Sequence, residues 1–400
     1  MSDEARPRWA RGSTPFPLEE PPEHTAIREG VRAVCASFPD AYWRDLDARR
    51  QYPEAFVRAM TEAGWLGALI PAEYGGLGLG LGEAAVILEE VNRQGGNAGP
   101  AHAQMYVMGT LLRHGSEEQK ARYLPAIADG RLRLQAFAVT EPEAGSDTTR
   151  ITTIAQRRGD RWVIDGQKIY VSRVQHSDLM LLLARTSPRD PARPTDGLSL
   201  FLVDLRDAGE AVRPRRLPVM MNNETNELTI AGLEVPAENL IGREGNGFRQ
   251  IVDGWNAERI LIAAECVGDG RWFVERAARY AGERVVFDRP LGANQGVQFP
   301  IAAAHAQVEA ADLIRRRAAA RFDAGLPCGP DANIAKYLAS EAAWAAANAC
   351  LDTHGGHGFN AEHDVERKFR ETRLYKVAPI SNNLVLAYVG HRVLGMPRSY

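Results

Sequence analysis

The chain has 400 residues, a net charge of −3 at neutral pH and a hydrophobic content of 45%. This length exceeds one ordinary hydrophobic core, so two or three packed regions are expected. The balanced charge argues against a nucleic-acid-binding protein, which needs a basic face, and no apolar run reaches the roughly 18 residues of a membrane span. With no apolar signal region and no CxxC pair among its four cysteines, the sequence predicts a cytoplasmic protein with free thiols.

The periodicity of the apolar residues changes twice along the chain. Residues 1–22 are rich in Pro, Arg and Glu and predict a mobile tail. Residues 23–131 have apolar positions at three- and four-residue spacing, as in 83–91, and predict a helical domain. Residues 132–240 contain short β-branched runs, with a hairpin turn expected at Asp165-Gly166 and an exposed loop at residues 187–194. Ala-rich patterns then predict helices within residues 241–400, at 255–280, 297–324 and 331–351.

Several short motifs follow one another in a fixed order. They are PAEYGG at residues 71–76, AVTEPEAGSD at 138–147, DGQKIYVS at 165–172, Glu258-Arg259, and GGHGFN at 355–360. In this order and spacing they resemble the motifs of the acyl-CoA dehydrogenase flavoproteins, from about residue 23 to the C-terminus. The resemblance implies an α+β architecture: an N-terminal helical domain, a central small β-barrel domain and a C-terminal four-helix bundle. It also implies FAD as the cofactor.

Two sets of cofactor-binding residues are implied by the resemblance. Within one chain, aromatic faces would stack on the flavin and hydroxyl groups would bond its rim, with Tyr170 and Ser172 covering the ring face and its N5 side. This first set is Phe137, Val139, Thr140, Gly145, Ser146, Tyr170, Ser172 and Ser381. A second set would hold the pyrophosphate and adenosine of a neighbouring subunit's FAD, which implies a homotetramer built as a dimer of dimers. The second set is Arg284, Phe287, Gln295, Asp352, Gly355 and Gly356.

The position of the catalytic base is unusual. Pro379 stands where many members of this family carry a catalytic glutamate, whereas Glu258 stands at the alternative base position of the isovaleryl-CoA and long-chain branches. The mostly apolar helical stripe around Glu258 would desolvate its carboxylate and raise its pKa, as a general base requires. The plain alternative is that Glu258 pairs with an arginine and fixes a helix. Pro379 also lacks the N–H that the family directs at the thioester oxygen, a donor worth roughly 2.7–4 kcal/mol.

The resemblance further implies substrate contacts, at Ser146, Asn256, Arg259 and Ala378. Arg259 matches a family residue at the CoA nucleotide, and Ala378 replaces a frequent tyrosine, which opens space for a branched or bulky acyl chain. The expected reaction is α,β-dehydrogenation of an acyl-CoA thioester to the 2-enoyl-CoA, with electrons passed to an electron-transfer flavoprotein. Two alternatives stay open: a flavin-dependent oxygenase or oxidase on the same fold, and a non-catalytic acyl-CoA-binding or assembly protein. His354, His357 and His363 lie close in sequence, but the glycines between them belong to the expected cofactor loop, so no metal site is predicted.

Overall fold

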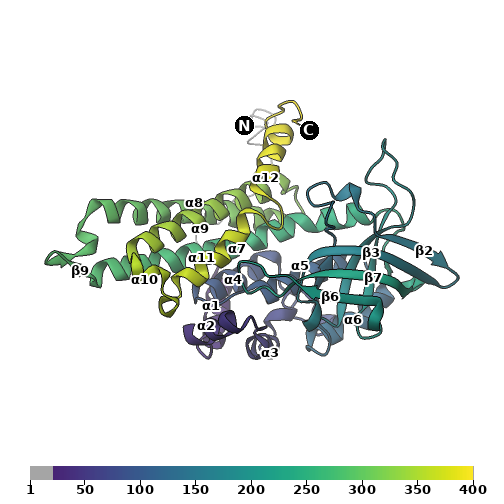
Figure 1. Ribbon diagram of the computed structural model, residues 1–400, viewed down its shortest axis with the longest axis horizontal. Coiled ribbons are helices and arrows are strands. Elements are labelled where there is room, and N and C mark those ends of the chain that lie inside the picture. Colours follow the sequence, from purple (N-terminus) through teal and green to yellow (C-terminus); the bar gives the residue numbers. More distant parts are fainter. Residues whose placement is uncertain (1–20, 400) are drawn as a thin grey trace.

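The computed structural model describes residues 21–399, in which helices are followed by strands and then by long helices (Figure 1). The tail expected at residues 1–22 falls almost wholly outside the described residues, and Pro22 already begins the first helix. The molecule is elongated. The strands of its large sheet lie at one end of the long axis, and the connection between α7 and α8, which contains the short strands β9 and β10, lies at the other end.

The N-terminal helices pack around α4, which spans Leu81–Arg93. This helix is buried on nearly every side because α1 and the C-terminal helices α7 and α8 all pack against it. Two carboxylates are buried with it: Arg28 lies 2.9 Å from Glu89 and 3.1 Å from Glu90. Such pairing is what makes a buried charge tolerable. The other helices of this region are α1 (Pro22–Cys35), α2 (Asp40–Arg49), α3 (Glu54–Glu62), α5 (Gly99–His114) and α6 (Glu117–Ala128).

The middle of the chain forms one sheet. Its path of paired strands runs β6, β7, β3, β2, β4, β5 and β8, with β1 parallel to β4. Along β4, Leu179, Leu181 and Leu183 join the core beneath α5 and α6, whereas Met180 and Leu182 point into the interior of the β domain. This alternation is the two-residue period of a strand buried on both faces. The strands are β1 (Leu134–Ala138), β2 (Ile154–Arg158), β3 (Arg161–Ser172), β4 (Leu179–Arg185), β5 (Leu198–Asp204), β6 (Val212–Arg216), β7 (Thr225–Pro236) and β8 (Leu240–Ile241).

The hairpin turn predicted at Asp165-Gly166 is wrong. Both residues lie inside β3, where the pairing with β7 shifts register between Ile164 and Gly166. Glycine is required there because a Cβ at Gly166 would lie 2.3 Å from Oγ1 of Thr153. The turn between β2 and β3 instead includes Gly159, whose φ of +64° suits a tight reversal. The loop predicted at residues 187–194 does lie between β4 and β5 and is largely exposed.

The C-terminal region is built on α7, which runs for 37 residues from Gly247 to Glu283. The first turn of α7 packs closely against β5, since a Cβ at Gly247 would lie 2.7 Å from the backbone of Ser199. Its later turns pack against α8 and α9, so this one helix joins the β domain to the far end of the molecule (Figure 1). The remaining elements are β9 (Val285–Val286), β10 (Arg289–Pro290), α8 (Gln295–Asp323), α9 (Gly329–His354), α10 (Gly356–Phe359), α11 (Val365–Arg373) and α12 (Asn382–Tyr388).

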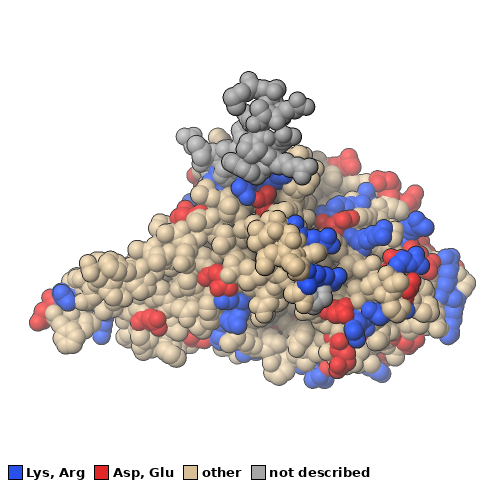
Figure 2. Space-filling model, turned by 90° about the horizontal axis from the view of Figure 1, so that it is seen from above, with Lys and Arg blue, Asp and Glu red and all other residues tan. Residues whose placement is uncertain are grey.

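The arm formed by α7, α8 and α9 shows mostly uncharged surface on the face seen in Figure 2, whereas basic and acidic side chains intersperse elsewhere. Near the end of this arm several large apolar side chains are exposed: Val285 by 58%, Phe287 by 93%, Phe299 by 60% and Phe359 by 77%. A group of exposed aromatic rings of this kind is typical of an interaction surface.

Candidate functional site

The loop that follows β1 is fixed in place by the neighbouring strand β3. The carbonyl of Thr140 accepts a hydrogen bond from the N–H of Ile169 at 2.9 Å, and the carbonyl of Val139 accepts one from Nζ of Lys168 at 3.0 Å. The amide and hydroxyl of Thr140, by contrast, donate to no other residue in the described part of the chain. Thr140 is half-buried, so both donors are available to a ligand beside this loop.

Glu141 anchors the same loop from below. Its carboxylate lies 2.9 Å from Nζ of Lys168 and accepts hydrogen bonds from the N–H groups of Thr152 at 2.6 Å and Thr153 at 2.9 Å. Burial alone would raise the pKa of Glu141, but Lys168 and these bonds outweigh it and lower the pKa to about 2. Burial pulls the pKa of Lys168 down only to about 8. The pair is therefore ionised at neutral pH and holds the loop rigidly.

Tyr170 and Ser172 end β3 beside this loop. Tyr170 has a φ of +59° and a side chain that is 64% exposed, an uncommon conformation and an uncommon exposure for an aromatic residue in a strand. The pairing of β3 with β7 is interrupted between Lys168 and Val171, which frees Tyr170 to turn outward. An uncovered aromatic face and nearby hydroxyl groups fit a planar ring with a polar edge, as a flavin has.

Three further residues of the first predicted cofactor set, Phe137, Gly145 and Ser146, lie on β1 and in the loop that follows it. Phe137 on β1 is half-buried, and its ring centroid lies 5.9 Å from that of Tyr106 on α5. Gly145 and Ser146 are exposed in the loop that runs on from Glu141. A Cβ at Gly145 would meet no atom within 4 Å, so open space adjoins this loop.

Glu258 lies on α7, close to the end of that helix that meets the β domain. Its side chain is 8% exposed, and no hydrogen bond or ion pair to it occurs within residues 21–399. Desolvation by burial raises the pKa of Glu258 to about 7, although the nearby charges of His102 and Arg259 oppose this rise. The alternative that Glu258 is held in an ion pair finds no such contact in the described chain. A carboxyl that exchanges its proton near neutral pH is suited to general-base work.

Two residues of α5 near Glu258 escaped the sequence analysis. Nδ1 of His102 lies 2.7 Å from Oε1 of Glu265, two turns along α7 from Glu258, although the angle is not that of a hydrogen bond. The other ring nitrogen, Nε2, is buried and has no hydrogen-bond partner in the described part of the chain. Tyr106 lies one turn further on, its ring centroid 5.2 Å from that of His102. Burial raises the pKa of Tyr106, and Glu258 adds to this rise. A histidine four residues from a tyrosine in an apolar helix was the signal available.

Two of the predicted substrate residues, Asn256 and Arg259, lie on α7 beside Glu258. The guanidinium of Arg259 is largely buried, 5.6 Å from the ring centroid of Trp255, and its Nε has no hydrogen-bond partner within residues 21–399. A Cβ at Gly329 would lie 2.9 Å from the hydroxyl of Tyr388 and 4.0 Å from Oδ1 of Asn256, so α7, α9 and α12 meet here.

The segment that contains Ala378 is tied to the same helices. Nζ of Lys336, buried on α9, donates to the carbonyl of Ile380 at 2.7 Å and to Oδ1 of Asn382 at 2.6 Å. Ala378 is half-buried and Pro379 is exposed. The Oγ of Ser381 accepts from the N–H of Leu384 at 3.4 Å and so caps α12.

The second predicted cofactor set lies at the other end of the molecule. Arg284 and Phe287 flank β9, and Gln295 begins α8. Asp352, Gly355 and Gly356 lie where α9 ends and α10 begins. All are exposed, and the side chain of Arg284 contacts no charged partner in the described part. Figure 1 places β9 and α10 at the end of the long axis opposite β3. One chain therefore does not bring its two sets to the same ligand.

Metal-ligating side chains do not converge in the described residues, where no group of three or more His, Cys, Asp or Glu side chains could hold an ion. His354, His357 and His363 are close together, but His354 stacks on Tyr280 at 4.1 Å and bonds the carbonyl of Cys350 through Nδ1 at 2.8 Å. Within residues 21–399, no helix is both long enough and apolar enough to cross a membrane.

Three domain families of known proteins match consecutive parts of the chain. The N-terminal, middle and C-terminal domain families of acyl-CoA dehydrogenase match residues 21–131, 136–232 and 245–393. The chain is 34% identical over 384 residues to the acyl-CoA dehydrogenase FadE12 of Mycobacterium tuberculosis, covering 95% of this chain and 98% of that one. It is 33% identical over 381 residues to the glutaryl-CoA dehydrogenase of Desulfococcus multivorans, covering 93% and 96%.

Among solved structures, butyryl-CoA dehydrogenase from Megasphaera elsdenii superposes with a TM-score of 0.88 at 25% identity, over 94% of this chain and 100% of that one. The helical, β and helical regions together define a flavoprotein oxidoreductase. The chain belongs to the acyl-CoA dehydrogenase family.

Proposed function

We propose that this protein binds FAD and oxidises an acyl-CoA thioester to the 2-enoyl-CoA, with Glu258 as the base. The observation that carries the proposal is the carboxyl of Glu258, which is buried, unpaired in the described chain and has a pKa of about 7. This base placement is that of the isovaleryl-CoA and long-chain branches. When bound, FAD supplies the hydride acceptor at N5.

The proposed role of each residue follows from its chemistry. The carboxylate of Glu258 takes the proton from the α-carbon, and the electron pair of that C–H bond forms the new double bond as the β-hydrogen leaves as hydride. A base with a pKa near the working pH combines a large ionised fraction with enough basicity. Tyr170 covers the flavin face, and Thr140, Ser172 and Ser381 bond its rim. Phe137, Val139, Gly145 and Ser146 enclose its edge.

The acyl pocket is proposed to accept a branched or bulky chain. Ala378 is small, and Asn256, Arg259 and Ser146 are left to contact the rest of the thioester. Because Pro379 has no N–H, another donor must serve the thioester oxygen, or the reaction is slowed. Pro379→Ala restores an N–H and should speed flavin reduction if the backbone keeps its course. A pocket widened by a methylene discriminates by only roughly 1–3 kcal/mol, so a modest preference for methyl-branched over straight thioesters is expected.

The second cofactor set is proposed to act on a neighbouring subunit, in a homotetramer built as a dimer of dimers. Its residues, among them the exposed Phe287, lie at the end of the arm that contains β9, far from the loop after β1 of the same chain (Figure 1). Arg284→Ala should therefore weaken FAD retention and tetramer stability together, because the guanidinium is expected on the pyrophosphate. A variant that keeps full FAD as a stable monomer would contradict this assembly. Lys120→Ala, which removes a half-buried cation paired with Glu117 of its own helix at 2.8 Å, is the control.

The electrons are proposed to pass to an electron-transfer flavoprotein, and the location is proposed to be cytoplasmic. All four cysteines are free and buried, as expected in a reducing compartment. Anaerobic mixing of the yellow holoprotein with a panel of acyl-CoA thioesters tests the reaction. Bleaching of the flavin with formation of the 2-enoyl-CoA is the expected result. Rapid oxygen consumption by the reduced flavin on aeration would support an oxygenase or oxidase instead, and binding without bleaching would support a non-catalytic protein.

A further inference from the structure

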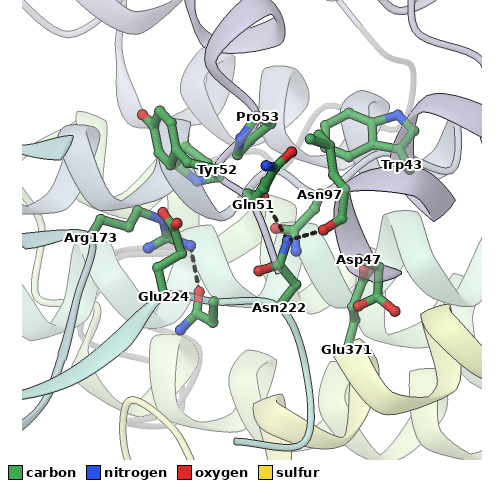
Figure 3. Close-up of a pocket in the computed structure, with 13 residues that line it drawn as sticks. Trp43, Asp47, Gln51, Tyr52, Pro53, Asn97, Arg173, Asn222, Glu224 and Glu371 are labelled. Carbon is green, nitrogen blue, oxygen red and sulfur yellow. Dashed lines mark hydrogen bonds between the residues drawn. The ribbon is translucent and has the colours of Figure 1, made fainter. Parts of the chain in front are cut away.

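Arg173 is a buried cation directly behind the strand end that carries Tyr170 and Ser172. It follows β3 in the left-handed conformation, with a φ of +61°, and its side chain points toward the Asn222–Glu224 segment across a small polar cavity (Figure 3). Only 8% of the residue is exposed. Its Nη2 donates to Oδ1 of Asn223 at 2.6 Å.

This contact settles which way the amide of Asn223 faces. A guanidinium can only donate, so the atom of Asn223 that faces Arg173 must be its oxygen. Nδ2 of Asn223 therefore faces the other way, where it donates to Oγ of Ser172 at 2.9 Å and, at a longer 3.5 Å, to Oγ1 of Thr225. The direction of every hydrogen bond from Arg173 to Ser172 is fixed by the chemistry of the arginine.

The hydroxyl proton of Ser172 is consequently left without an acceptor. Its oxygen already accepts from Asn223, and within the described residues Ser172 donates to no other group. The residue is half-buried at the end of β3, on the side where the flavin ring is proposed to lie. The free O–H therefore faces a ligand that presents an acceptor.

The surroundings hold this arrangement in place. The N–H of Arg173 donates to the carbonyl of Glu224 at 3.1 Å, and Nδ2 of Asn222 donates to the carbonyls of Leu46 at 3.2 Å and Gln51 at 2.7 Å. The first turn of α5 also approaches closely, since a Cβ at Gly99 would lie 2.4 Å from Nη2 of Arg173. These contacts hold Arg173 and the segment that carries Asn223 against the end of β3.

We propose that Arg173 is a positioning residue that acts through Asn223 to make the hydroxyl of Ser172 a hydrogen-bond donor toward N5 of the flavin. This inference rests on the proposed binding of FAD. N5 of the oxidised ring accepts a hydrogen bond, whereas N5 of the reduced ring carries a hydrogen of its own. The relay therefore stabilises the oxidised cofactor and holds its N5 in a fixed place for the incoming hydride.

Replacing Arg173 by Met frees the amide of Asn223 to turn over. Ser172 can then donate to Oδ1 of Asn223, and oxidised N5 loses its donor. At a fixed solution potential, losing this hydrogen bond should raise the ratio of reduced to oxidised FAD by about three- to tenfold. This factor corresponds to the free energy of one net hydrogen bond. Loss of the positive charge alters the same ratio independently of Ser172.

A double-mutant cycle separates the two effects. The absorption spectrum and the midpoint potential of bound FAD are measured in the wild type, Arg173→Met, Ser172→Ala and the double variant. Losing Arg173 is expected to raise the ratio about three- to tenfold more when Ser172 is present than when it is replaced, and Arg173→Lys, which keeps a charged donor, should give near-wild-type values. Asn223→Asp, which leaves the arginine in place but also presents an acceptor oxygen to Ser172, should reproduce the Ser172-dependent part.

Equal effects of Arg173→Met in both backgrounds would overturn the relay and leave a charge effect only. If Arg173→Met fails to fold, Asn223→Asp in the same two backgrounds decides the matter by the same criterion. Absence of FAD from the wild-type protein would instead refute the proposed function itself, so the two failures are distinguishable.

Discussion

Two buried glutamates on opposite sides of the candidate site have opposite proton affinities. Glu141, beneath the loop after β1, has a pKa of about 2 because Lys168 and the N–H groups of Thr152 and Thr153 outweigh its burial. Glu258, on α7, has a pKa of about 7 because burial acts on it with no hydrogen-bond partner in the described chain. Their exposures are nearly equal, at 5% and 8%. Burial disfavours the ionised form of both carboxyl groups, and the hydrogen-bond and charge partners decide whether the pKa falls or rises.

The difference separates a structural carboxylate from a reactive one. Glu141 is held ionised and fully bonded, so it can only fix the loop that carries Val139 and Thr140. Glu258 has a pKa close to neutral pH, so small changes in its surroundings shift its carboxyl group between the protonated and the ionised form.

Removing the partner of Glu141 should have the largest effect on stability. Lys168→Met leaves a carboxylate buried without its counter-ion, which typically costs about 3–5 kcal/mol. The midpoint of urea unfolding at pH 7 and saturating FAD should fall accordingly. Lys168→Met combined with Glu141→Gln should recover part of the loss, because the stranded charge is gone. A single variant as stable as the wild type would show that the pair does not anchor the loop.

Removing the charge of Glu258 should raise the free energy of unfolding at pH 8, in contrast to the loss of stability expected at Glu141. The folded pKa of about 7 lies above the ordinary value of 4.5, so the unfolded chain ionises first as pH rises. The wild type therefore loses stability between pH 4.5 and 7 and no more above that range, by at most about 3 kcal/mol. Glu258→Gln should escape this loss and exceed the wild type in unfolding free energy at pH 8 but not at pH 4.5.

Glu141→Gln is the matched contrast for that measurement. The folded pKa of Glu141 is depressed, so its stabilising contribution is present above pH 4.5 and is lost as pH falls toward 2. Its replacement should therefore destabilise the protein at pH 8, where Glu258→Gln stabilises it. If both variants change stability in the same direction at pH 8, the contrast between the two sites is wrong.

The smallest effect is expected at His102. The charge of this histidine opposes the rise in the pKa of Glu258, and Arg259 does the same from α7. His102→Gln should move the midpoint of the pH profile of flavin reduction to higher pH, with Arg259 still limiting the shift. His114→Gln on the same helix, which lies 3.4 Å from Asp253, is the control and should leave the midpoint unchanged.

The fold followed from the sequence because its periodicities were strong. The spacing at 83–91 lies inside α4, and the three Ala-rich stretches lie largely within α7, α8 and α9. The error at Asp165-Gly166 arose because a glycine can mark a close approach, here to Thr153, as well as a turn. The domain boundaries came from the changes in periodicity and the residue roles came from the resemblance, and both remain predictions.

The network around the site could not be predicted because its contacts join distant segments. His102 meets Glu265, and Arg173 meets Asn223, only after α5 packs on α7 and the segment before β7 folds against the end of β3. A single sequence carries no signal for such pairs. The apolar stripe around Glu258 predicted that its carboxyl group would be desolvated. The lack of an ion-pair partner in the described chain could be seen only in the structure.

The most direct test of the whole account is the rate of flavin reduction by Glu258→Gln. Glutamine keeps the size and polarity of the side chain but cannot take the α-proton, so anaerobic stopped flow with an acyl-CoA that bleaches the wild type should show a loss of roughly 10²–10⁴-fold. The content of FAD and the affinity for the acyl-CoA should stay near those of the wild type. Reduction of the flavin at the wild-type rate would contradict the assignment of Glu258 as the base.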